Sequence, residues 1–433
     1  MLILELMTSL MLWIAIMIPI NSYILGINER SPYKLIQDVS NQTIFDVTKV
    51  GSEAYMNRVD LCSGDTGTST PSSYMMISQI IPVKSTSTEV TGIISDGQNI
   101  YVSLNSASTT DYDLITYNYK NISEPLDRID SGPGVLGLVN VGRNILVINS
   151  SVNSAIQKFK FDPTLMKLNK VGDYKISWSS SANPVYATKL AIIYPHLFVG
   201  LKKNNNEELF SIDLTKIDSV IGMAGAIDNK WELDSSVQDL WPMYDKYQHL
   251  LVSTAKEPEI IDLCLNCNFT YTPMTLFPFA PSVSSFDLFG SLGNVRSLIQ
   301  DNGSIYVGRT AGNNELFKIN IDRDYSTSTK NLNQNTAVSF VYDLVNSIDV
   351  NEGIYSMLIS GRNLFIAAGK NNSKIQIRDS FDLSKIIQTI NTTSSIIDLE
   401  CVGDKIFGVG SNYKMNGTST ESITPIIFEL IPA

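Results

Sequence analysis

The stretch "DNGSIYVG", residues 301–308, joins a polar turn to a short strand of β-branched and aromatic residues. Asp, Asn and Gly favour tight turns, and Ile, Tyr and Val favour strands. Related apolar bursts recur at 99–104, 144–149, 196–201, 249–254, 304–309, 363–368 and 405–410. They lie about 40 to 60 residues apart, which is typical of a β-propeller in which each repeat forms one blade.

A second apolar segment follows each burst, and its residues alternate as in a half-buried strand. These segments are 113–119, 156–162, 208–214, 259–265, 315–321, 374–380 and 425–430. Another strand precedes each burst, most clearly in "TGIISD", "YSMLIS" and "IIDLEC", and a weaker fourth strand follows at 385–390. We therefore expect an all-β protein, a seven-bladed β-propeller of four-stranded antiparallel blades with the first strand innermost.

The last repeat lacks a strand, because the chain ends at "ITPIIFELIPA", residues 423–433. An open ring would expose sheet edges. The alternating stretch "SYMMISQIIPV", residues 73–83, stands just before the first repeat and is suited to fill the gap. We predict a 3+1 closure, in which this N-terminal strand completes blade seven and the propeller spans residues 73–433.

The N-terminus is strongly apolar. Residues 10–20 have no charge, which is the length of a signal-peptide core, with cleavage expected after Ser22 or Gly26. An uncleaved signal anchor stays open, since residues 6–25 are also uncharged, as does a cytosolic apolar N-terminus. We interpret 1–26 as a signal peptide or signal anchor and 27–72 as an N-terminal extension. The expected location is secreted or cell-surface, with membrane contact only through 1–26 if uncleaved.

The composition argues against a nucleic-acid partner. The net charge is −11, charged residues make up 17% of the chain, and Lys and Arg form no cluster along the sequence. Binding to phosphates requires basic residues gathered on one face. The abundance of Ser, Thr and Asn instead predicts a neutral polar surface, which suits a protein outside the cytoplasm.

The four cysteines and the glycosylation motifs fit the same location. Disulfides are favoured, with Cys264 joined to Cys267 and Cys62 joined to Cys401 across the ends of the propeller. Free thiols, or a metal or redox role for "CLNC", stay open. Asn-x-Ser/Thr motifs occur at Asn41, Asn121, Asn149, Asn268, Asn302, Asn371, Asn391 and Asn416.

No catalytic, metal or cofactor site is predicted. His196 and His249 occupy the position of Asn99, Asn144 and Asn363, directly after the turn between first and second strands, so turn polarity accounts for them. The carboxylates assigned to the same turns are Asp96, Asp301, Asp398 and Asp404. The glycines assigned to positive φ in these turns are Gly97, Gly142, Gly303, Gly361 and Gly403.

Two resemblances support this interpretation, one architectural that spans most of 85–433 and one local. Segment 364–399 resembles the repeat of extracellular and WD-like β-propellers, in which a strand, a polar loop, an "I-x-I-x-D" strand and a further strand follow one another. Residues 55–83, "YMNRVDLCSGDTGTSTPSSYMMISQIIPV", are similar to part of the sema domains of semaphorins and plexins, which are richer in cysteine. The resemblance implies an extracellular β-propeller.

The favoured function is a recognition or adhesion module that binds a protein or a glycan through its loops. The loop cations proposed as ligand contacts are Lys202, Lys203, Arg309 and Lys370. Trp178, Trp231 and Trp241 are assigned to blade packing. Two alternatives stay open. One is a surface-coat or filament subunit, to which the aromatic-rich segment 268–294 would contribute an interface. The other is a propeller hydrolase or lyase, although we favour a non-enzymatic role.

Overall fold

The structure is a computed structural model of the chain. It describes the backbone of β1 (Lys34–Asp38), β2 (Thr43–Val50) and β3 (Glu53–Arg58), which form a separate three-stranded antiparallel sheet within the expected N-terminal extension. From residue 75 onward it describes 75–83, 89–106, 112–132, 134–141, 144–149, 155–175, 187–202, 208–217, 227–233, 235–243, 249–256, 260–264, 285–286, 295–301, 304–311, 314–322, 341–369, 373–402, 405–416 and 419–432.

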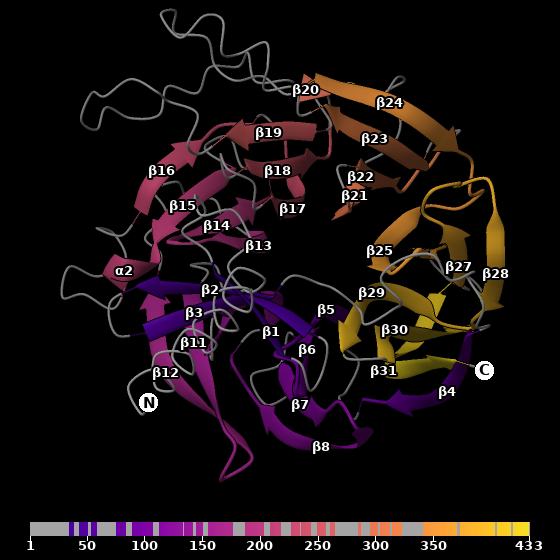
Figure 1. Cartoon of the computed structure of the whole chain (residues 1–433). Helices are drawn as coiled ribbons and strands as arrows, with labels where there is room; N and C mark the ends of the chain where they lie inside the picture. The colour runs from indigo at the N-terminus through magenta and orange to yellow at the C-terminus, as the bar shows by residue number, and fades with distance from the viewer. Residues whose placement is uncertain are drawn as a thin grey trace, which may run out of the picture.

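Seven four-stranded antiparallel sheets form a closed ring, and the predicted β-propeller is confirmed (Figure 1). The first strand of each sheet lies innermost and contacts the first strands of both neighbouring blades. These inner strands are β5 (Glu89–Ser95), β9 (Val135–Val141), β13 (Ala187–Ile193), β17 (Val237–Met243), β21 (Val295–Asp301), β25 (Ile354–Ser360) and β29 (Ser395–Val402).

The apolar bursts are the second strands, as predicted. They are β6 (Asn99–Asn105), β10 (Asn144–Asn149), β14 (His196–Leu201), β18 (His249–Thr254), β22 (Ser304–Arg309), β26 (Asn363–Ala368) and β30 (Lys405–Asn416). The alternating segments are the third strands, β7 (Leu114–Asn118), β11 (Ala155–Asp162), β15 (Leu209–Asp213), β19 (Ile260–Cys264), β23 (Leu316–Asp322), β27 (Lys374–Asp379) and β31 (Ser419–Pro432). Most second-strand residues are buried on both sides of the sheet, which explains their continuous apolar runs.

The outer strands are less uniform than the inner ones. In blades one to six they are β8 (Asn121–Ile129), β12 (Lys167–Lys175), β16 (Ile227–Trp231), β20 (Ser285–Phe286), β24 (Val341–Ile348) and β28 (Ile386–Asn391). Strand β20 pairs with β19, so segment 268–294 contains the outer strand of blade four. The sequence predicted only a long connection between blades four and five, and that prediction was incomplete. One short helix, α2 (Leu214–Ile217), follows β15.

The predicted 3+1 closure is confirmed. Strand β4 (Met75–Pro82) pairs antiparallel with β31, from Ile426 opposite Pro82 to Pro432 opposite Met75. Blade seven thus consists of β29, β30 and β31 from the C-terminal end of the chain and β4 from the N-terminal side. Backbone hydrogen bonds between distant parts of the chain close the ring.

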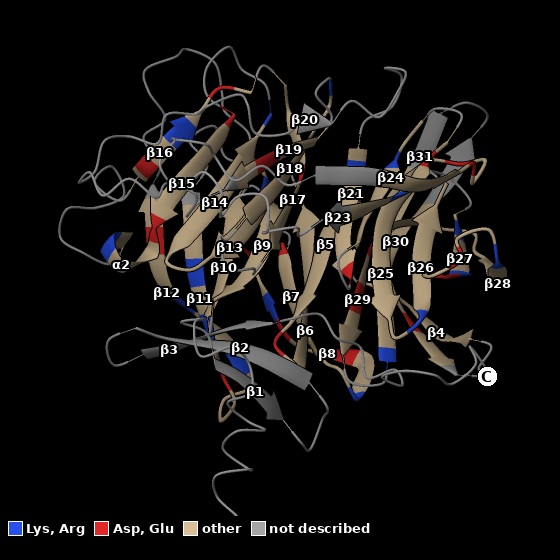
Figure 2. Cartoon of the chain, turned by 45° about the horizontal axis from the view of Figure 1, so that its top comes forward, with Lys and Arg blue, Asp and Glu red and all other residues tan. Residues whose placement is uncertain are grey.

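The hydrophobic core is divided among the interfaces between blades. Seven clusters of buried residues each draw their members from two adjacent sheets, including one cluster between blades seven and one. Trp231 is buried against Phe198, and Trp241 packs between blades four, five and six, so both contribute to blade packing as predicted. Trp178 lies outside the described residues. Charged side chains are few on the strands (Figure 2), as expected when both faces of each sheet are covered.

Candidate functional site in the central channel

Every inner strand contains a β-bulge at the same place. In β5 the register with the second strand shifts at Thr91, which has no partner. In each of the other inner strands one residue is skipped in the same way. A bulge adds one residue to a strand and redirects the side chains that follow it. The residues directly after the bulges are Gly92, Gly137, Lys189, Asp239, Ser297, Ser356 and Asp398, which we call the inner ring.

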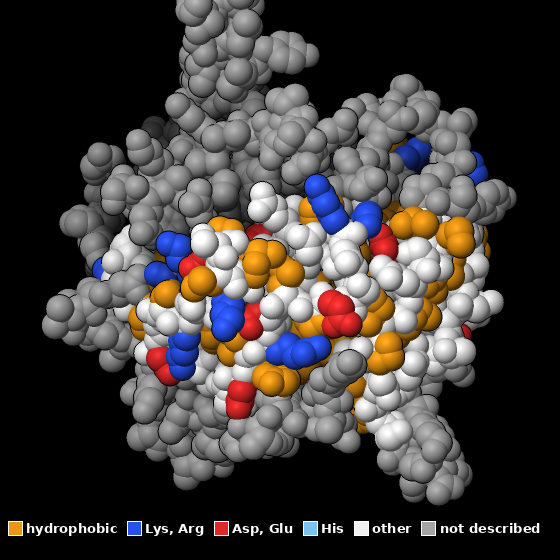
Figure 3. Space-filling model, turned by 90° about the horizontal axis from the view of Figure 1, so that it is seen from below, with side chains coloured by type: hydrophobic (Ala, Val, Ile, Leu, Met, Phe, Trp, Pro, Cys, Tyr) orange, Lys and Arg blue, Asp and Glu red, His pale blue; other side chains and the backbone are white. Residues whose placement is uncertain are grey.

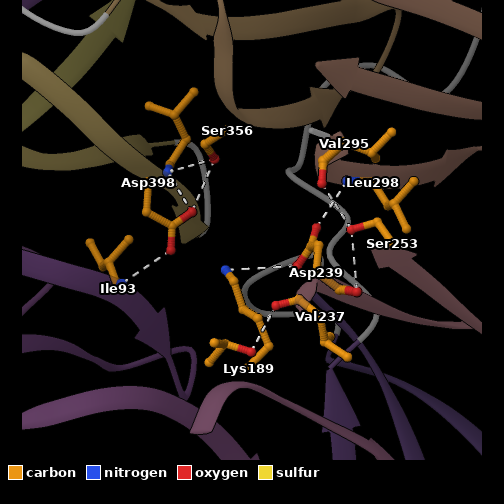
Figure 4. Close-up of polar contacts among 11 residues, drawn as sticks. Ile93, Lys189, Val237, Asp239, Ser253, Val295, Leu298, Ser356 and Asp398 are labelled. Carbon is orange, nitrogen blue, oxygen red and sulfur yellow. Dashed lines mark hydrogen bonds and ion pairs between the residues drawn. The ribbon is translucent and has the colours of Figure 1, made fainter. Parts of the chain in front are cut away.

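Asp398 of β29 connects three blades (Figure 4). Its Oδ2 accepts the N–H of Ile93 in blade one at 3.2 Å. Its Oδ1 accepts the hydroxyl of Ser356 in blade six and the N–H of Leu399 in its own strand, both at 3.0 Å. The N–H of Leu399 also donates to Ser356 Oγ at 3.2 Å. This carboxylate therefore ties together the blades on both sides of the last one.

Asp239 makes the same kind of bond between blades four and five. Its Oδ2 accepts the N–H of Leu298 at 2.9 Å. Leu298 follows the inner-ring residue of its blade, as Ile93 does in blade one. The Nζ of Lys189, from blade three, lies 3.7 Å from Asp239 Oδ1, and Figure 4 shows it extending between the two aspartates. The inner ring thus contains two carboxylates and one ammonium group.

The pKa values of both aspartates are raised, and the main cause is burial, which disfavours the charged carboxylate. The positive charge of Lys189 and the backbone N–H donors lower the same two pKa values, but by less. Such perturbed groups occur at active sites and also in structural networks. Here the carboxylate oxygens accept backbone N–H groups of the next blade, which makes a structural role sufficient to explain their position.

Hydroxyl groups provide a second set of ties, each donating to a backbone carbonyl oxygen of the next blade. The pairs are Thr91 with Val135 at 2.7 Å, Thr188 with Val237 at 2.9 Å, and Ser253 with Val295 at 3.1 Å. Each accepting residue stands two positions before an inner-ring residue and is a buried valine. The channel wall is therefore a network of bonds between neighbouring blades.

In three blades, a carboxylate directly before the third strand forms a hydrogen bond with the segment that connects the outer strand to the next blade. These carboxylates accept backbone N–H groups in the pairs Asp113 with Ser131 at 3.1 Å, Glu208 with Leu233 at 2.8 Å, and Glu315 with Val350 at 2.8 Å. The pKa of Glu315 is raised, mainly by burial. These acidic residues were not singled out from the sequence, although "DL" or "EL" begins several of the alternating segments.

The two histidines begin second strands, as expected, but each also has a carboxylate neighbour. His196 Nδ1 lies 3.1 Å from Asp228 Oδ2. His249 is fully buried, and its Nδ1 lies 2.8 Å from Asp262 Oδ1. Turn polarity is therefore an incomplete explanation, since each histidine also joins its second strand to a carboxylate on an outer or third strand.

The turn assignment was wrong for Asp398, which lies within β29 on the channel side of the fold. Asp96 does occupy a turn, where its Oδ1 accepts the N–H groups of Gln98 and Asn99. Asp301 is the last residue of β21, and Asp404 lies outside the described residues. The predicted positive φ is confirmed for Gly97 and Gly361, at 90° and 56°. Gly142, Gly303 and Gly403 lie outside the described residues.

The structure does not bring the proposed loop cations together. Lys202 is exposed directly after β14. Arg309 is the last residue of β22 and only 2% exposed, with its guanidinium 5.7 Å from the ring of Phe317. It therefore does not lie on an exposed loop. Lys203 and Lys370 lie outside the described residues.

The structure describes some of the residues predicted to form disulfides or to carry glycans. Cys401 is buried in β29 and is not a free thiol, whereas Cys62 and Cys267 lie outside the described residues, as does the side chain of Cys264. Asn121 and Asn391 are exposed at strand ends, but Asn149 is buried at the end of β10. The structure describes only the backbone of Asn416, in β30, and Asn41, Asn268, Asn302 and Asn371 lie outside the described residues. The disulfide pairings and the glycans stay predictions.

Comparison of the chain with protein-family models and with curated proteins found no match to either. The similarity to sema domains therefore stays a local resemblance. Within the described residues, no three His, Cys, Asp or Glu side chains are grouped closely enough to hold a metal ion. No helix in that part of the chain has the length and apolar character needed to cross a membrane.

Proposed function

We propose that this propeller is a non-catalytic recognition module, exported to the cell surface or beyond, which binds a protein or a glycan through loops on one face of the ring. The observation that carries the proposal is the contrast between strands and loops. Of the seven second strands, β10, β14, β18, β22 and β26 have six residues, β6 has seven and β30 has twelve. The segments that follow second strands range from 417–418 in blade seven to 106–113 in blade one.

A constant frame with variable loops is the arrangement that binding proteins use, because the frame fixes loops whose sequences are free to differ. All connections from second to third strands leave the blades at the same face. Tyr112 lies in one such connection and is 44% exposed. Its neighbour Asp113 accepts the N–H and the hydroxyl of Ser131, which fixes the chain beside the tyrosine.

An exposed tyrosine on a fixed loop provides a large contact area at a low cost in conformational entropy. Lys202 leaves β14 at the same face and adds a positive charge to it. Tyr112 and Lys202 are therefore the described residues that we assign to ligand contact. The export part of the proposal depends on residues 1–26, interpreted as a signal peptide or signal anchor.

A hydrolase or lyase is the alternative that one observation favours, namely the raised pKa values of Asp239 and Asp398 at the channel. A raised carboxyl pKa suits a general acid. Both carboxylates, however, accept N–H groups from the next blade, a structural role that accounts for their position without a substrate.

The experiment uses the full chain, secreted from eukaryotic cells and purified. It is applied to an array of defined oligosaccharides and to a library of cell-surface ectodomains. We expect a specific ligand whose affinity falls at least tenfold in Tyr112→Ala or Lys202→Ala. The control is Leu165→Ala, which removes an exposed side chain from the turn between β11 and β12 at the opposite face. It should bind like the wild type.

Thermal unfolding of each variant separates loss of contact from loss of fold. Asp239→Asn distinguishes the alternative, since it should lower stability and leave ligand affinity unchanged if the channel is structural. Absence of binding to both arrays, or binding that both loop variants retain, would overturn the proposal. Turnover of an array ligand that Asp239→Asn abolishes would establish the enzyme instead.

A further inference from the structure

The outer hairpin of blade two differs in charge from the rest of the chain. Strands β11 and β12 pair from Ala155 opposite Lys175 to Asp162 opposite Lys167, and Figure 1 shows the hairpin extending outward beyond the strands of the neighbouring blades. Residues 155–175 contain five lysines and two aspartates, a net charge of +3, whereas the whole chain has a net charge of −11. We call this segment the basic hairpin.

Two large apolar side chains occupy the tip of the basic hairpin. Leu165 is 62% exposed and Met166 is 40% exposed, and both lie in the turn that joins β11 to β12. Side chains exposed to this extent bury little apolar area, so packing within the blade does not explain their size. Exposed apolar groups that are gathered at one place mark interaction sites.

The backbone of the turn holds these side chains in a fixed position. Asp162 Oδ1 accepts the N–H of Thr164 at 2.8 Å and the N–H of Leu165 at 3.2 Å. Met166 has a φ of 54°, in the left-handed region, where Gly and Asn are the usual residues. A methionine at this position costs conformational energy, and strained residues of this kind cluster at functional sites. A contact outside the fold therefore explains the side chain of Met166 better than the turn does.

Exposed lysines flank the apolar tip on one face of the hairpin. Asp162 lies opposite Lys167, and Lys160 lies two residues before Asp162 on the same strand. Opposed residues, and residues two apart on a strand, share a face, so the two exposed lysines are diagonal neighbours. Lys170 and Asp173 form an ion pair with each other at 2.6 Å and add no net charge. Figure 3 looks onto the rim at the bottom of Figure 1, to which the hairpin extends, and shows Lys and Arg side chains at the left and centre beside apolar and acidic ones.

We propose that the basic hairpin docks the propeller onto an anionic lipid surface, with Leu165 and Met166 inserted at the level of the headgroups and Lys160 and Lys167 bound to the acidic lipids. Segments that lie in a membrane interface combine apolar side chains with lysines in this way. The long lysine side chains can reach the headgroups while the tip lies deeper. Because the whole chain is acidic, an anionic surface repels it except through a basic segment, and this sets the point of contact.

The position of the N-terminal extension favours a lipid surface over an acidic protein as the occupant. Strand β3 contacts β9, the inner strand of blade two, and Figure 1 shows β2 and β3 over that blade. Residues 1–26 are apolar and are interpreted as a signal peptide or signal anchor. Only residues 27–33 separate them from β1, a span of at most about 25 Å. An uncleaved anchor would therefore hold the membrane close to the blade that carries the basic hairpin.

Docking by this hairpin also sets the orientation of the propeller. The turns from third to fourth strands lie at the face opposite to the loops that join second to third strands, because consecutive strands are antiparallel. The loop face, with Tyr112 and Lys202, therefore points away from the lipid surface. Binding of a ligand at the loop face and docking of the hairpin are compatible, and neither requires the other.

The test measures binding of the purified, secreted full chain to vesicles by co-sedimentation. The vesicles consist of phosphatidylcholine alone or contain phosphatidylserine as one lipid in three. We expect binding to the vesicles with phosphatidylserine and little to those without it, with weaker binding as salt is added, because salt screens the lysines. Lys160→Gln and Lys167→Gln should each weaken binding about fivefold.

The apolar tip is tested by the double variant Leu165→Asn with Met166→Asn. Asparagine tolerates the left-handed conformation, so the variant should keep the turn and lose only the apolar side chains. We expect it to weaken binding at least tenfold, because insertion into the interface scales with buried apolar area.

Two matched controls make the same changes away from the tip. Val171→Asn replaces a side chain that is 51% exposed on β12, but it lies five residues beyond Met166, about 16 Å away. Interfacial segments insert by about 5–10 Å, so this variant should bind like the wild type. Lys385→Gln removes an exposed lysine from the corresponding turn of blade six and should also leave binding unchanged. Circular dichroism should show that all variants keep the fold.

Oxidation of methionine reports the contact directly, whether or not residues 1–26 have been cleaved. Met166 in the tip and Met76 on the outer strand of blade seven are both exposed, at 40% and 48%. Hydrogen peroxide should therefore oxidise both to the sulfoxide in the free chain. Vesicles with phosphatidylserine should slow the oxidation of Met166 at least threefold and leave that of Met76 unchanged, as measured by mass spectrometry of the peptides.

Absence of binding to vesicles with phosphatidylserine would overturn the proposal and leave an acidic protein as the partner of the hairpin. Binding that does not depend on phosphatidylserine, or that the tip and lysine variants retain, would overturn it as well, as would equal oxidation of Met166 with and without vesicles. These results do not depend on whether the loop face binds a ligand.

Discussion

Gly308→Ala is expected to destabilise the propeller at the interface between blades five and six. Gly308 lies in β22, and a methyl group on it would stand 2.6 Å from Cγ2 and 3.1 Å from Cβ of Ile354, the buried residue two positions before the inner-ring residue Ser356. Carbon atoms in contact normally lie about 3.5–4.0 Å apart. Ile354 would therefore have to move by about 1 Å, inside an interface where both blades are packed.

Overpacking of this kind costs about 1–3 kcal/mol. The substitution also restricts the unfolded chain, which stabilises the protein by about 0.4–1 kcal/mol. Gly137→Ala isolates this second effect, because the nearest atom to its new methyl group, Leu190 Cγ, is 3.6 Å away. We expect Gly308→Ala to be less stable than Gly137→Ala by about 1–3 kcal/mol.

Urea unfolding followed by tryptophan fluorescence and circular dichroism measures the difference. Ile354→Ala removes the colliding methyl group and alone costs about 2–5 kcal/mol. The Ile354→Ala variant keeps the Cβ atom at 3.1 Å, so in that background most, but not all, of the difference between Gly308→Ala and Gly137→Ala should disappear, which corresponds to a coupling energy of about 1–3 kcal/mol between the two sites. Equal stability of the two glycine variants, or additive effects of Gly308→Ala and Ile354→Ala, would refute the packing that we assign to this interface.

Three further predictions concern the seam and the predicted modifications. Asp398→Asn should reduce the unfolding free energy most in mildly acidic solution, with the gap narrowing as pH rises, in urea titrations at several pH values. The wild-type pKa is raised, so the folded state holds the proton longer and stability is lost as pH rises from about 4 through the folded pKa. Non-reducing peptide mapping of the secreted chain should join Cys62 to Cys401. Glycopeptide mass spectrometry should find a glycan on the exposed Asn121 and none on the buried Asn149.

The second strands could be located from the sequence because two independent signals coincide there. Ser304 begins β22 directly after the sequence Asp-Asn-Gly, which favours a turn, and β22 is buried throughout. A turn fixes where a strand begins, and burial on both faces makes it continuously apolar. The closing strand could be predicted for another reason, since a ring with one strand too few leaves an edge, and 73–83 alternates strongly.

The inner ring was missed because the bulge interrupts the alternation on which strand prediction depends. Asp398 was grouped with turn residues, and Asp239 within "VQDLW" was not singled out. When the inner strands are aligned on the bulge, four consecutive positions share a pattern. The residue before the bulge is aliphatic or alanine, the bulged residue is of any type, the next is small or charged, and the fourth is Ile, Leu or Met. That pattern, as in "VTGI", "VQDL" and "IIDL", is readable once the repeat is known.

The partner of His249 required the register between strands, which a single burst does not provide. His249 pairs across the sheet with Cys264, and Asp262 stands two residues away on the same strand. Diagonal neighbours of this kind lie within reach of long side chains. The outer strands were the least predictable, because β20 has only two residues and pairing rather than composition defines it.

Three different kinds of interaction close the ring at blade seven. Backbone bonds join β31 to β4 within the blade, the carboxylate of Asp398 accepts the N–H of Ile93 in blade one, and a buried cluster fills the space between blades seven and one. These interactions involve different atoms, but all of them require the closed arrangement of the ring. Opening the ring must therefore break them together. Cooperation of this kind keeps the frame rigid without any contribution from the loops. The loop face is consequently free to vary in sequence.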